Sequence, residues 1–337
     1  MRPRFAVCFD GRLAAELDAS GAACARLGDV RVSRPHTVLR ARRRLADLLT
    51  TDRPDAVICH STWTFGLSAP VLRRISVPAV LWVHDRLSGR PWAERWAGLT
   101  IPAAIISNSR FTAESVHALY PTPEPSIVYA PIPAPLRIDD AERRGVREAL
   151  GVQRDGECVV LIASRFEAWK GHQQLLAALA TVTPPWRLWI AGGAQKDGEA
   201  TYVAALRATC EAGGIADRVR FLGDRRDVPT LMQAADIHCQ PNAGPEPFGL
   251  AFVEALHAGL PVVTTAMGGA IEIVTPACGV LVPPSDGRAL RDTLERLILS
   301  GEARLALGMA GPARARELCD PARQLHGLST VVRSVAA

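Results

Sequence analysis

Lysine is nearly absent from this 337-residue chain: only Lys170 and Lys196 occur, beside 37 arginines. The formal net charge of +5 is also uneven, because residues 1–136 carry 17 basic and 11 acidic side chains, whereas residues 137–337 carry 22 and 23. Such asymmetry is typical of a protein that meets an anionic partner or a membrane surface, and simple solvation is the alternative. In so lysine-poor a chain, the position of Lys170 is informative.

Long apolar runs and paired cysteines are lacking too. No apolar stretch approaches the roughly 20 residues that span a bilayer, and the N-terminal segment has neither the apolar core nor the cleavage site of a signal peptide. The eight cysteines are scattered, with no CxxC, which favours buried free thiols over disulfides or a metal site. We therefore expect a cytoplasmic protein, with peripheral membrane contact as an additional hypothesis.

Several catalytic signatures are missing. The sequence has no GxGxxG after its first strand, no Walker A sequence, no GxSxG, no HExxH and no DxD pair. These absences argue against NAD binding, P-loop ATP hydrolysis, α/β-hydrolase chemistry and a carboxylate-bound divalent metal. We expect no metal site, no resident cofactor and no nucleic-acid partner.

Short apolar runs that alternate with helical patterns are abundant. In the first part of the chain they predict strands, with helices over 12–27 and 36–50; the strands span 4–10, 29–33, 55–60, 78–84, 103–108 and 126–131. After the Pro-dense segment 121–136 the alternation restarts, with strands over 158–164, 186–193, 218–223, 235–241, 261–265 and 279–283. Continuous apolar runs separated by helices are typical of buried parallel strands in βαβ units.

The predicted fold is α/β, with two Rossmann-like parallel-sheet domains that face an interdomain cleft. We place the first domain at 1–135, the second at 136–319, and a C-terminal helix at 320–337 that packs back on the first domain. Ligands of such sheets bind at the carboxyl ends of the strands, and clefts between domains are common substrate sites.

The stretch GPEPFGLAFVEALHAG in the second domain follows a strand and opens a helix near Gly249. A helix start offers unpaired N–H groups to a phosphate. Glu246 lies before that helix and Glu254 lies inside it, so the two acids would flank one elongated ligand rather than share a proton. The alternative is a surface acid followed by an unrelated helix acid.

A second basic loop, SRFEAWKG, also follows a strand and carries Arg165 and the scarce Lys170. Two cations at a strand end could neutralise a diphosphate and stabilise the charge of a leaving phosphate. A solvent-exposed basic pair is the alternative. Two glycine turns, at Gly192 and at Gly268–Gly269, follow predicted strands 186–193 and 261–265 and gain weight as further strand-end loops that converge on one site.

The first domain offers fewer candidates. His84 ends the strand in LWVHD and could contact a substrate hydroxyl, with a structural histidine as the alternative. Gly11 is the single glycine after the first strand. A basic amphipathic helix carries four arginines that could dock on anionic lipid, meet an acidic acceptor or face water: Arg40, Arg42, Arg43 and Arg44.

Taken in order over 158–284, these segments resemble the retaining family-4 glycosyltransferases with a GT-B fold. The E-x7-E pattern of that family is matched by Glu246 and Glu254. The resemblance of the first domain is weaker and rests on WVHD and IISNSRFT. That domain is short for the family, and the usual glycine-rich loop is reduced to Gly11.

The resemblance implies transfer of a hexose-type sugar from a nucleoside-diphosphate sugar, with the anomeric configuration retained and without a metal. It implies that Glu246 contacts the donor sugar and that Glu254 binds the ribose. Arg165 and Lys170 would hold the diphosphate, and His84 would lie near the sugar and acceptor. The remaining donor-binding positions implied are backbone segments: Gly11, Gly192, Phe248, Gly249 and Leu250.

The acceptor stays open: a sugar, a lipid-linked molecule or a small molecule. Two alternatives to glycosyl transfer also remain. One is a nucleotide-sugar epimerase or phosphorylase of the same fold. The other is a non-catalytic subunit that only binds nucleotide sugars.

Overall fold

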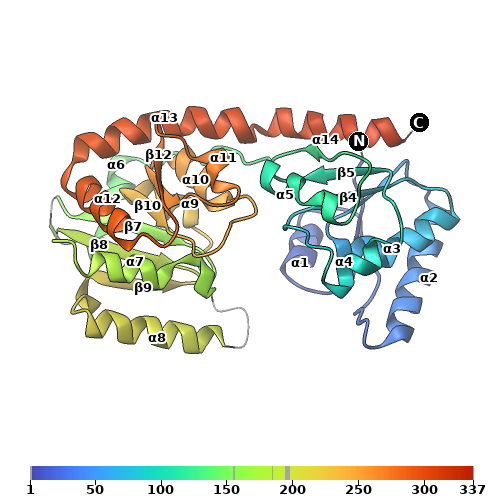
Figure 1. Cartoon of the computed structure of the whole chain (residues 1–337), viewed down its shortest axis with the longest axis horizontal. Coiled ribbons are helices and arrows are strands. Elements are labelled where there is room, and N and C mark those ends of the chain that lie inside the picture. Colours follow the sequence, from blue (N-terminus) through green and yellow to red (C-terminus); the bar gives the residue numbers. More distant parts are fainter. Residues whose placement is uncertain (1, 155, 184, 194–197, 337) are drawn as a thin grey trace. The chain divides into compact units, whose positions relative to one another are not determined.

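The computed structural model describes residues 2–154, 156–183, 185–193 and 198–336, so Lys196 lies outside the described residues. The chain divides into two compact units (Figure 1). Unit 1 comprises Met1–Val128 and Leu325–Ala337, and unit 2 comprises Tyr129–Gln324. The division precedes the expected boundary at residue 135, because Tyr129, Ile132 and Ile138 pack against a core cluster of unit 2.

Unit 2 is built on a six-stranded sheet with the order β12-β11-β10-β7-β8-β9, and its paired strands are all parallel. The strands are β7 Cys158–Ala163, β8 Trp186–Ala191, β9 Val219–Gly223, β10 Ile237–Gln240, β11 Val262–Thr265 and β12 Gly279–Val282. The helices are α6 Asp140–Ala149, η2 Ala168–Lys170, α7 His172–Leu179, α8 Glu199–Ala212, η3 Ala216–Arg218, α9 Val228–Ala234, α10 Leu250–Ala258, α11 Ala270–Ile273, α12 Gly287–Leu299 and α13 Gly301–Cys319.

Helices cover both faces of this sheet, which explains the continuous apolar runs. In β8, Trp186 joins the core cluster shared with α7, α8 and α12, whereas Trp189 joins the cluster shared with α9, α10 and α13. Both indole rings are buried, at 1% and 0% exposure. Alternate residues of one strand therefore fill two separate cores.

Unit 1 contains a four-stranded parallel sheet, β3-β4-β5-β6, and a separate two-stranded parallel sheet, β1-β2. The strands are β1 Phe5–Val7, β2 Cys24–Arg26, β3 Val57–Cys59, β4 Ala79–Val83, β5 Ala104–Ser107 and β6 Ser126–Ile127. The helices are α1 Arg12–Ala19, α2 Pro35–Thr51, α3 Thr62–Arg74, α4 Trp92–Ala97, α5 Arg110–Glu114, η1 Val116–Ala118 and α14 Pro321–Val335. The prediction of two parallel-sheet α/β domains is confirmed.

The expected helix 12–27 and strand 29–33 were wrong. Helix α1 ends at Ala19, just before Gly21, whose φ of +70° disfavours further helix. The second strand is β2, which pairs with β1 from Phe5 opposite Cys24. Residues 29–33 have no strand partner: Val30 is buried in the core, and the Arg31 amide donates to the Thr37 hydroxyl instead. The alternating pattern there reflects a loop with one buried residue.

The last helix contributes to unit 1. Three of its residues, Leu328, Val331 and Val335, pack against a cluster made of Val80, Trp82, Ile106 and Val128. These partners belong to β4 and β5 and to the residue after β6. An apolar stripe on α14 thus covers one face of the four-stranded sheet.

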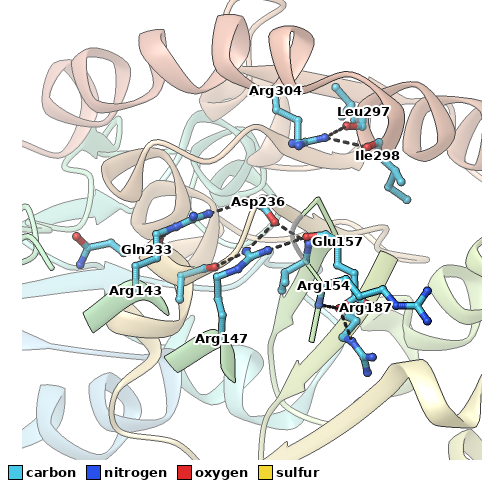
Figure 2. Close-up of polar contacts among 12 residues, drawn as sticks. Arg143, Arg147, Arg154, Glu157, Arg187, Gln233, Asp236, Leu297, Ile298 and Arg304 are labelled. Atoms are coloured by element: carbon cyan, nitrogen blue, oxygen red, sulfur yellow. Dashed lines mark hydrogen bonds and ion pairs between the residues drawn. The ribbon is translucent and has the colours of Figure 1, made fainter. Parts of the chain in front are cut away.

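At the amino ends of β7 and β10, an arginine network ties α6 to the sheet of unit 2 (Figure 2). Arg147 donates to Asp236 Oδ2 at 2.8 Å, to the Ala234 carbonyl at 2.9 Å and to the Glu157 carbonyl at 2.6 Å. Arg143 reaches Asp236 Oδ1 at 2.8 Å. The network lies at the edge opposite the strand ends that the sequence marks as functional.

All eight cysteines are free, and six of them are buried, as predicted. Among the helices of the described residues, none has the length and apolar character to cross a membrane.

Candidate active site

The predicted site residues of unit 2 gather at the carboxyl ends of β7, β10 and β11. Lys170 ends the short helix η2 after β7, Glu246 lies between β10 and α10, and Gly268 follows β11. Because β11, β10 and β7 are neighbours in the sheet, the loops that follow them emerge side by side.

Lys170 and Glu246 form a direct ion pair. Lys170 Nζ lies 2.7 Å from Glu246 Oε2, and only 12% of each side chain is exposed. The same ammonium lies 4.0 Å from the centre of the Trp169 ring, a cation–π contact. The sequence predicted both residues as site residues but not this pairing, since it assigned them to different parts of a ligand.

Two buried amides complete the surroundings of the Glu246 carboxylate. Gln240 Nε2 donates to Glu246 Oε2 at 3.2 Å, and Asn242 Nδ2 donates to the same oxygen at 3.3 Å. Sequence reasoning missed both residues, because it treated residues 235–241 only as a strand. Two amide side chains at the end of a buried strand were the available signal.

The backbone of Glu246 packs against the glycine pair after β11. Glu246 and Gly268 form a parallel bridge, and the Gly269 amide donates to the Glu246 carbonyl at 2.7 Å. Gly268 has a φ of +62°, and a Cβ there would lie 2.3 Å from that carbonyl oxygen. The weak glycine signal therefore marks the close approach that fixes Glu246.

Helix α10 starts directly after Gly249, whose φ is +112°. The residue before the helix is a glycine and supplies no side-chain cap, so the first backbone N–H groups of α10 can meet an anion. Phe248 is buried and stacks on Tyr129 with ring centroids 5.5 Å apart, whereas Leu250 is exposed. Phe248 thus anchors the loop through its ring and leaves only its backbone for a ligand.

Glu254 lies within α10 and is half-buried. Burial raises the pKa of its carboxyl group, and within the described part of the chain that carboxylate has no hydrogen-bond partner. Such a group gains from a ligand hydroxyl that donates to it.

Arg165 and Gly192 lie on the neighbouring loops. Arg165 is 45% exposed and pairs with Glu167 at 3.1 Å. The Gly192 amide donates to the Gly223 carbonyl at 2.9 Å, and a Cβ at Gly192 would lie 2.0 Å from the Ser164 carbonyl oxygen. The turn after β8 therefore packs on the loop that carries Arg165.

A cavity of about 440 Å³ lies elsewhere in unit 2, between α7 and the start of α12. Asn242 and Thr265 contribute to its wall, together with Gln174, Asp286 and Arg291. None of the residues predicted for the site lines this cavity. The Lys170–Glu246 ion pair, in contrast, joins two of them directly.

In unit 1, His84 follows β4 and pairs with a second histidine. His84 Nε2 lies 3.1 Å from Nδ1 of His60, which follows β3, and the two rings are stacked at 5.3 Å. Burial and then the charge of His60 lower the pKa of His84 to about 4. His60 was not predicted, although VICH and WVHD place a histidine at the same point of two adjacent strands.

The other candidates of unit 1 have simpler surroundings. Asn108 after β5 donates to the His84 carbonyl at 3.1 Å, which ties a third strand end to the pair. Gly11 precedes α1 in an extended conformation, and nothing lies within 4 Å of a Cβ placed on it. Its place as a donor-binding residue stays a prediction.

Comparison with known proteins agrees with this arrangement. Residues 149–314 match the family model described as glycosyl transferases group 1, and residues 6–133 match the model described as glycosyltransferase family 4. The first match covers most of unit 2. The second covers residues 6–128 of unit 1 and the first five residues of unit 2. The chain thus carries a glycosyltransferase family 4 domain followed by a glycosyl transferases group 1 domain.

The chain is 33% identical over 223 residues to a D-inositol 3-phosphate glycosyltransferase of Xylanimonas cellulosilytica. The matched segment covers 63% of this chain and 52% of that relative. It is 33% identical over 172 residues to a phosphatidyl-myo-inositol mannosyltransferase of Mycobacterium leprae, covering 49% of this chain and 44% of the relative. The chain thus spans about half the length of the curated relatives it matches.

The fold has a solved counterpart in Anabaena Alr3699/HepE in complex with UDP. The TM-score is 0.88 at 24% identity, covering 98% of this chain and 91% of that one. The expected GT-B architecture is confirmed by this likeness. In the described residues, no group of three or more His, Cys, Asp or Glu side chains is arranged to hold a metal ion.

Proposed function

We propose that this glycosyltransferase moves a hexose-type sugar from a nucleoside-diphosphate sugar to an acceptor hydroxyl, with retention and without a metal. The buried Lys170–Glu246 pair carries the proposal, because it places a cation and an anion side by side next to a free helix start. A nucleotide sugar needs both: a cation for its diphosphate and a carboxylate for its hydroxyls.

The proposed contacts follow the elements of unit 2. Glu246 accepts from donor-sugar hydroxyls, and the amides at the start of α10 meet the phosphates. Glu254 accepts from the ribose hydroxyls, which offsets the burial that raises its pKa. Arg165 and Lys170 neutralise the diphosphate, and His84 serves the donor sugar or the acceptor.

In the proposed reaction, the bond between the sugar C1 and the diphosphate oxygen breaks. The acceptor oxygen forms the new bond to C1 on the same face. The acceptor proton passes to an oxygen of the departing diphosphate, so no strong protein base is required. Lys170 and Arg165 stabilise the charge that develops on that diphosphate.

The proposal is tested with a donor panel of UDP-glucose, GDP-mannose, ADP-glucose and dTDP-glucose, each beside its nucleoside diphosphate. Specific binding raises the melting temperature by mass action. The donor that binds is then incubated with D-inositol 3-phosphate, the acceptor type in one relative's name. A glycoside product, unchanged in EDTA, supports the proposal; a sugar isomer formed without acceptor, or no binding of any donor, contradicts it.

We also propose a peripheral contact of unit 1 with anionic lipid. Helix α2 presents Arg40 and Arg43 as exposed side chains. Arg44 is exposed as well, but its guanidinium bonds the Leu27 carbonyl at 3.3 Å; Arg42 is only partly exposed and bonds the Leu67 carbonyl at 2.9 Å. Within the described residues, Arg40 and Arg43 are therefore the members of this basic cluster that are exposed and bonded to no other residue.

A further inference from the structure

We propose that Gln240 and Asn242 are positioning residues that hold the Glu246 carboxylate in the orientation needed to contact the donor sugar. This inference rests on the proposed function. Neither residue is predicted by the E-x7-E spacing, and both lie at the end of β10, before the loop that carries Glu246.

The donors to Glu246 all converge on one carboxylate oxygen. Lys170, Gln240 and Asn242 each donate to Oε2, at 2.7, 3.2 and 3.3 Å. Within the described residues, Oε1 accepts no hydrogen bond, and it is not closed off from solvent. The carboxylate is thus fixed through one oxygen and presents the other to a ligand.

The two amides orient each other. Gln240 Nε2 also donates to Asn242 Oδ1 at 2.9 Å. Because that oxygen of Asn242 is occupied by Gln240, its Nδ2 group is turned toward Glu246. Both hydrogens of Gln240 Nε2 are then used, and within the described residues Gln240 Oε1 is buried without a hydrogen-bond donor.

The backbone that carries this amide pair is itself tied to β11. The Thr264 hydroxyl donates to the Gln240 carbonyl at 2.8 Å, and the Thr265 hydroxyl donates to the Asn242 carbonyl at 2.8 Å. The two amide side chains are only 2% and 3% exposed. A pair this well held has few alternative rotamers and can impose its geometry on Glu246.

Neutral amides complement Lys170 in a way that a second cation would not. An ammonium has three N–H donors, and Lys170 gives one of them to Glu246. When its remaining donors turn to a diphosphate, the amides still stabilise the ionised carboxylate, because hydrogen bonds to a carboxylate favour its charged form. Different groups therefore serve the two parts of the donor: Lys170 is free to contact the diphosphate, while the two amides hold Glu246 for the sugar.

The test measures sugar preference, defined as the affinity for a nucleotide sugar divided by that for its nucleoside diphosphate. Isothermal titration of the full chain uses the four pairs of the donor panel. Gln240→Met and Asn242→Ser are expected to weaken binding of the nucleotide sugar by roughly tenfold. Binding of the bare nucleotide should change by less than about twofold, because the amides do not contact the diphosphate.

Trp186→Phe is the control, since it removes a buried hydrogen bond, from Trp186 Nε1 to the Val182 carbonyl at 3.0 Å, at the amino end of β8 and away from Glu246. It should keep the wild-type sugar preference, and circular dichroism melting establishes that each variant is folded. Equal weakening of sugar and nucleotide binding, or unchanged preference in both amide variants, overturns the inference alone. No donor binding by the wild-type chain overturns the proposed function and the inference with it.

Discussion

Unit 2 and unit 1 are both parallel α/β folds, yet they carry their functional residues differently. Unit 2 has one continuous six-stranded sheet, and its candidate residues form a buried network around Glu246. Unit 1 has two separate sheets, and its candidates are a histidine pair at the surface end of β3 and β4. The site in unit 2 is organised by charge and burial, whereas that in unit 1 is organised by ring stacking between neutral groups.

This contrast suggests a division of labour. A diphosphate sugar carries fixed charges, and a unit that recognises it needs a preformed cation and carboxylate. We expect the acceptor hydroxyl itself to need only hydrogen-bonding groups that do not attract the diphosphate, and His84, with its pKa lowered to about 4, suits that need. The following predictions test where this division holds.

The largest effect is expected in unit 2, from Lys170→Met. Removal of this ammonium should lower kcat for glycosyl transfer by roughly 10²- to 10³-fold, because the leaving diphosphate loses its buried counter-charge. Steady-state kinetics with the donor identified in the panel measures it. Lys170→Arg, which keeps the charge, should recover part of the rate.

Arg288→Met is a matched control for the loss of a cation, since the Arg288 side chain is 91% exposed and lies 3.7 Å from Asp292 only. It should leave the rate unchanged within about twofold, as expected of surface substitutions. Equal losses in Lys170→Met and Arg288→Met would mean that general charge, not the buried pair, drives the effect.

The second prediction moves to the opposite edge of the same sheet. Arg147→Met should destabilise the protein by about 3 kcal/mol. The Arg147 side chain is only 13% exposed, and its removal leaves the Asp236 carboxylate with fewer hydrogen-bond donors. Urea unfolding measures the change. The kcat of the folded fraction should stay within about twofold of wild type, because the network is remote from the strand ends that hold Glu246.

Arg154→Met tests this result at an exposed arginine close to the same network (Figure 2). Its expected cost is below about 0.5 kcal/mol. A large loss of kcat in Arg147→Met without loss of stability would show that the amino edge of the sheet is also part of the catalytic machinery.

The places of the candidate site residues in the fold were predictable from the sequence, but the contacts among their side chains were not. Glu246 and Lys170 follow strands whose apolar runs are unambiguous, so their placement at one sheet edge follows from parallel topology. Their ion pair joins residues 76 positions apart and depends on rotamers that only packing decides. Gln240 and Asn242 were missed because two amides near a strand end are a weak signal until their contact with Glu246 is seen.

Unit 1 was predicted less well for a related reason. Its strands are short: β1, β2 and β3 have three residues each, β4 has five, β5 four and β6 two, so hydrophobic periodicity gives only a weak signal there. The alternating residues Val30 and Val32 led to the prediction of a strand. The backbone N–H of Arg31, between them, bonds the Thr37 hydroxyl instead of a neighbouring strand. The register of β1 with β2 is a tertiary choice that a single sequence does not reveal.

The third prediction concerns a buried histidine in the core of unit 2. His238 is fully buried on β10, and neither ring nitrogen has a hydrogen-bond partner in the described residues. Burial lowers its pKa to about 4. Because the folded pKa lies below the unfolded value, the unfolded chain binds the proton first, and stability falls as the pH drops from about 6.5 to about 4.

His238→Leu should therefore raise the free energy of unfolding at pH 7.5 by about 1 kcal/mol, since an unpaired polar group is removed from an apolar core. It should also remove about 1.4 kcal/mol of the wild-type loss between pH 7.5 and pH 5.5. Urea titrations at both pH values measure this. An unchanged pH dependence would mean that water or a local opening already solvates His238.

The smallest effect for a single side chain is expected in unit 1, on vesicle binding. Each outward arginine near an anionic surface contributes about 1 kcal/mol, or roughly fivefold in binding. The double variant Arg40→Gln and Arg43→Gln should thus co-sediment about 25-fold more weakly with phosphatidylserine-containing vesicles than the wild-type chain. Neutral vesicles should bind neither protein.

Arg42→Gln is the informative comparison, because Arg42 belongs to the same basic run but faces the protein. Its guanidinium bonds the Leu67 and Gly66 carbonyls and lies 5.5 Å from the Trp96 ring centre. The substitution should lower the melting temperature and leave vesicle binding within about twofold, since its charge is not presented to lipid. If all three arginines affected binding equally, helix α2 would act through net charge rather than through one exposed face. The contrast between a charged site in unit 2 and a neutral histidine pair in unit 1 would then hold for the site residues but not for the surface of unit 1.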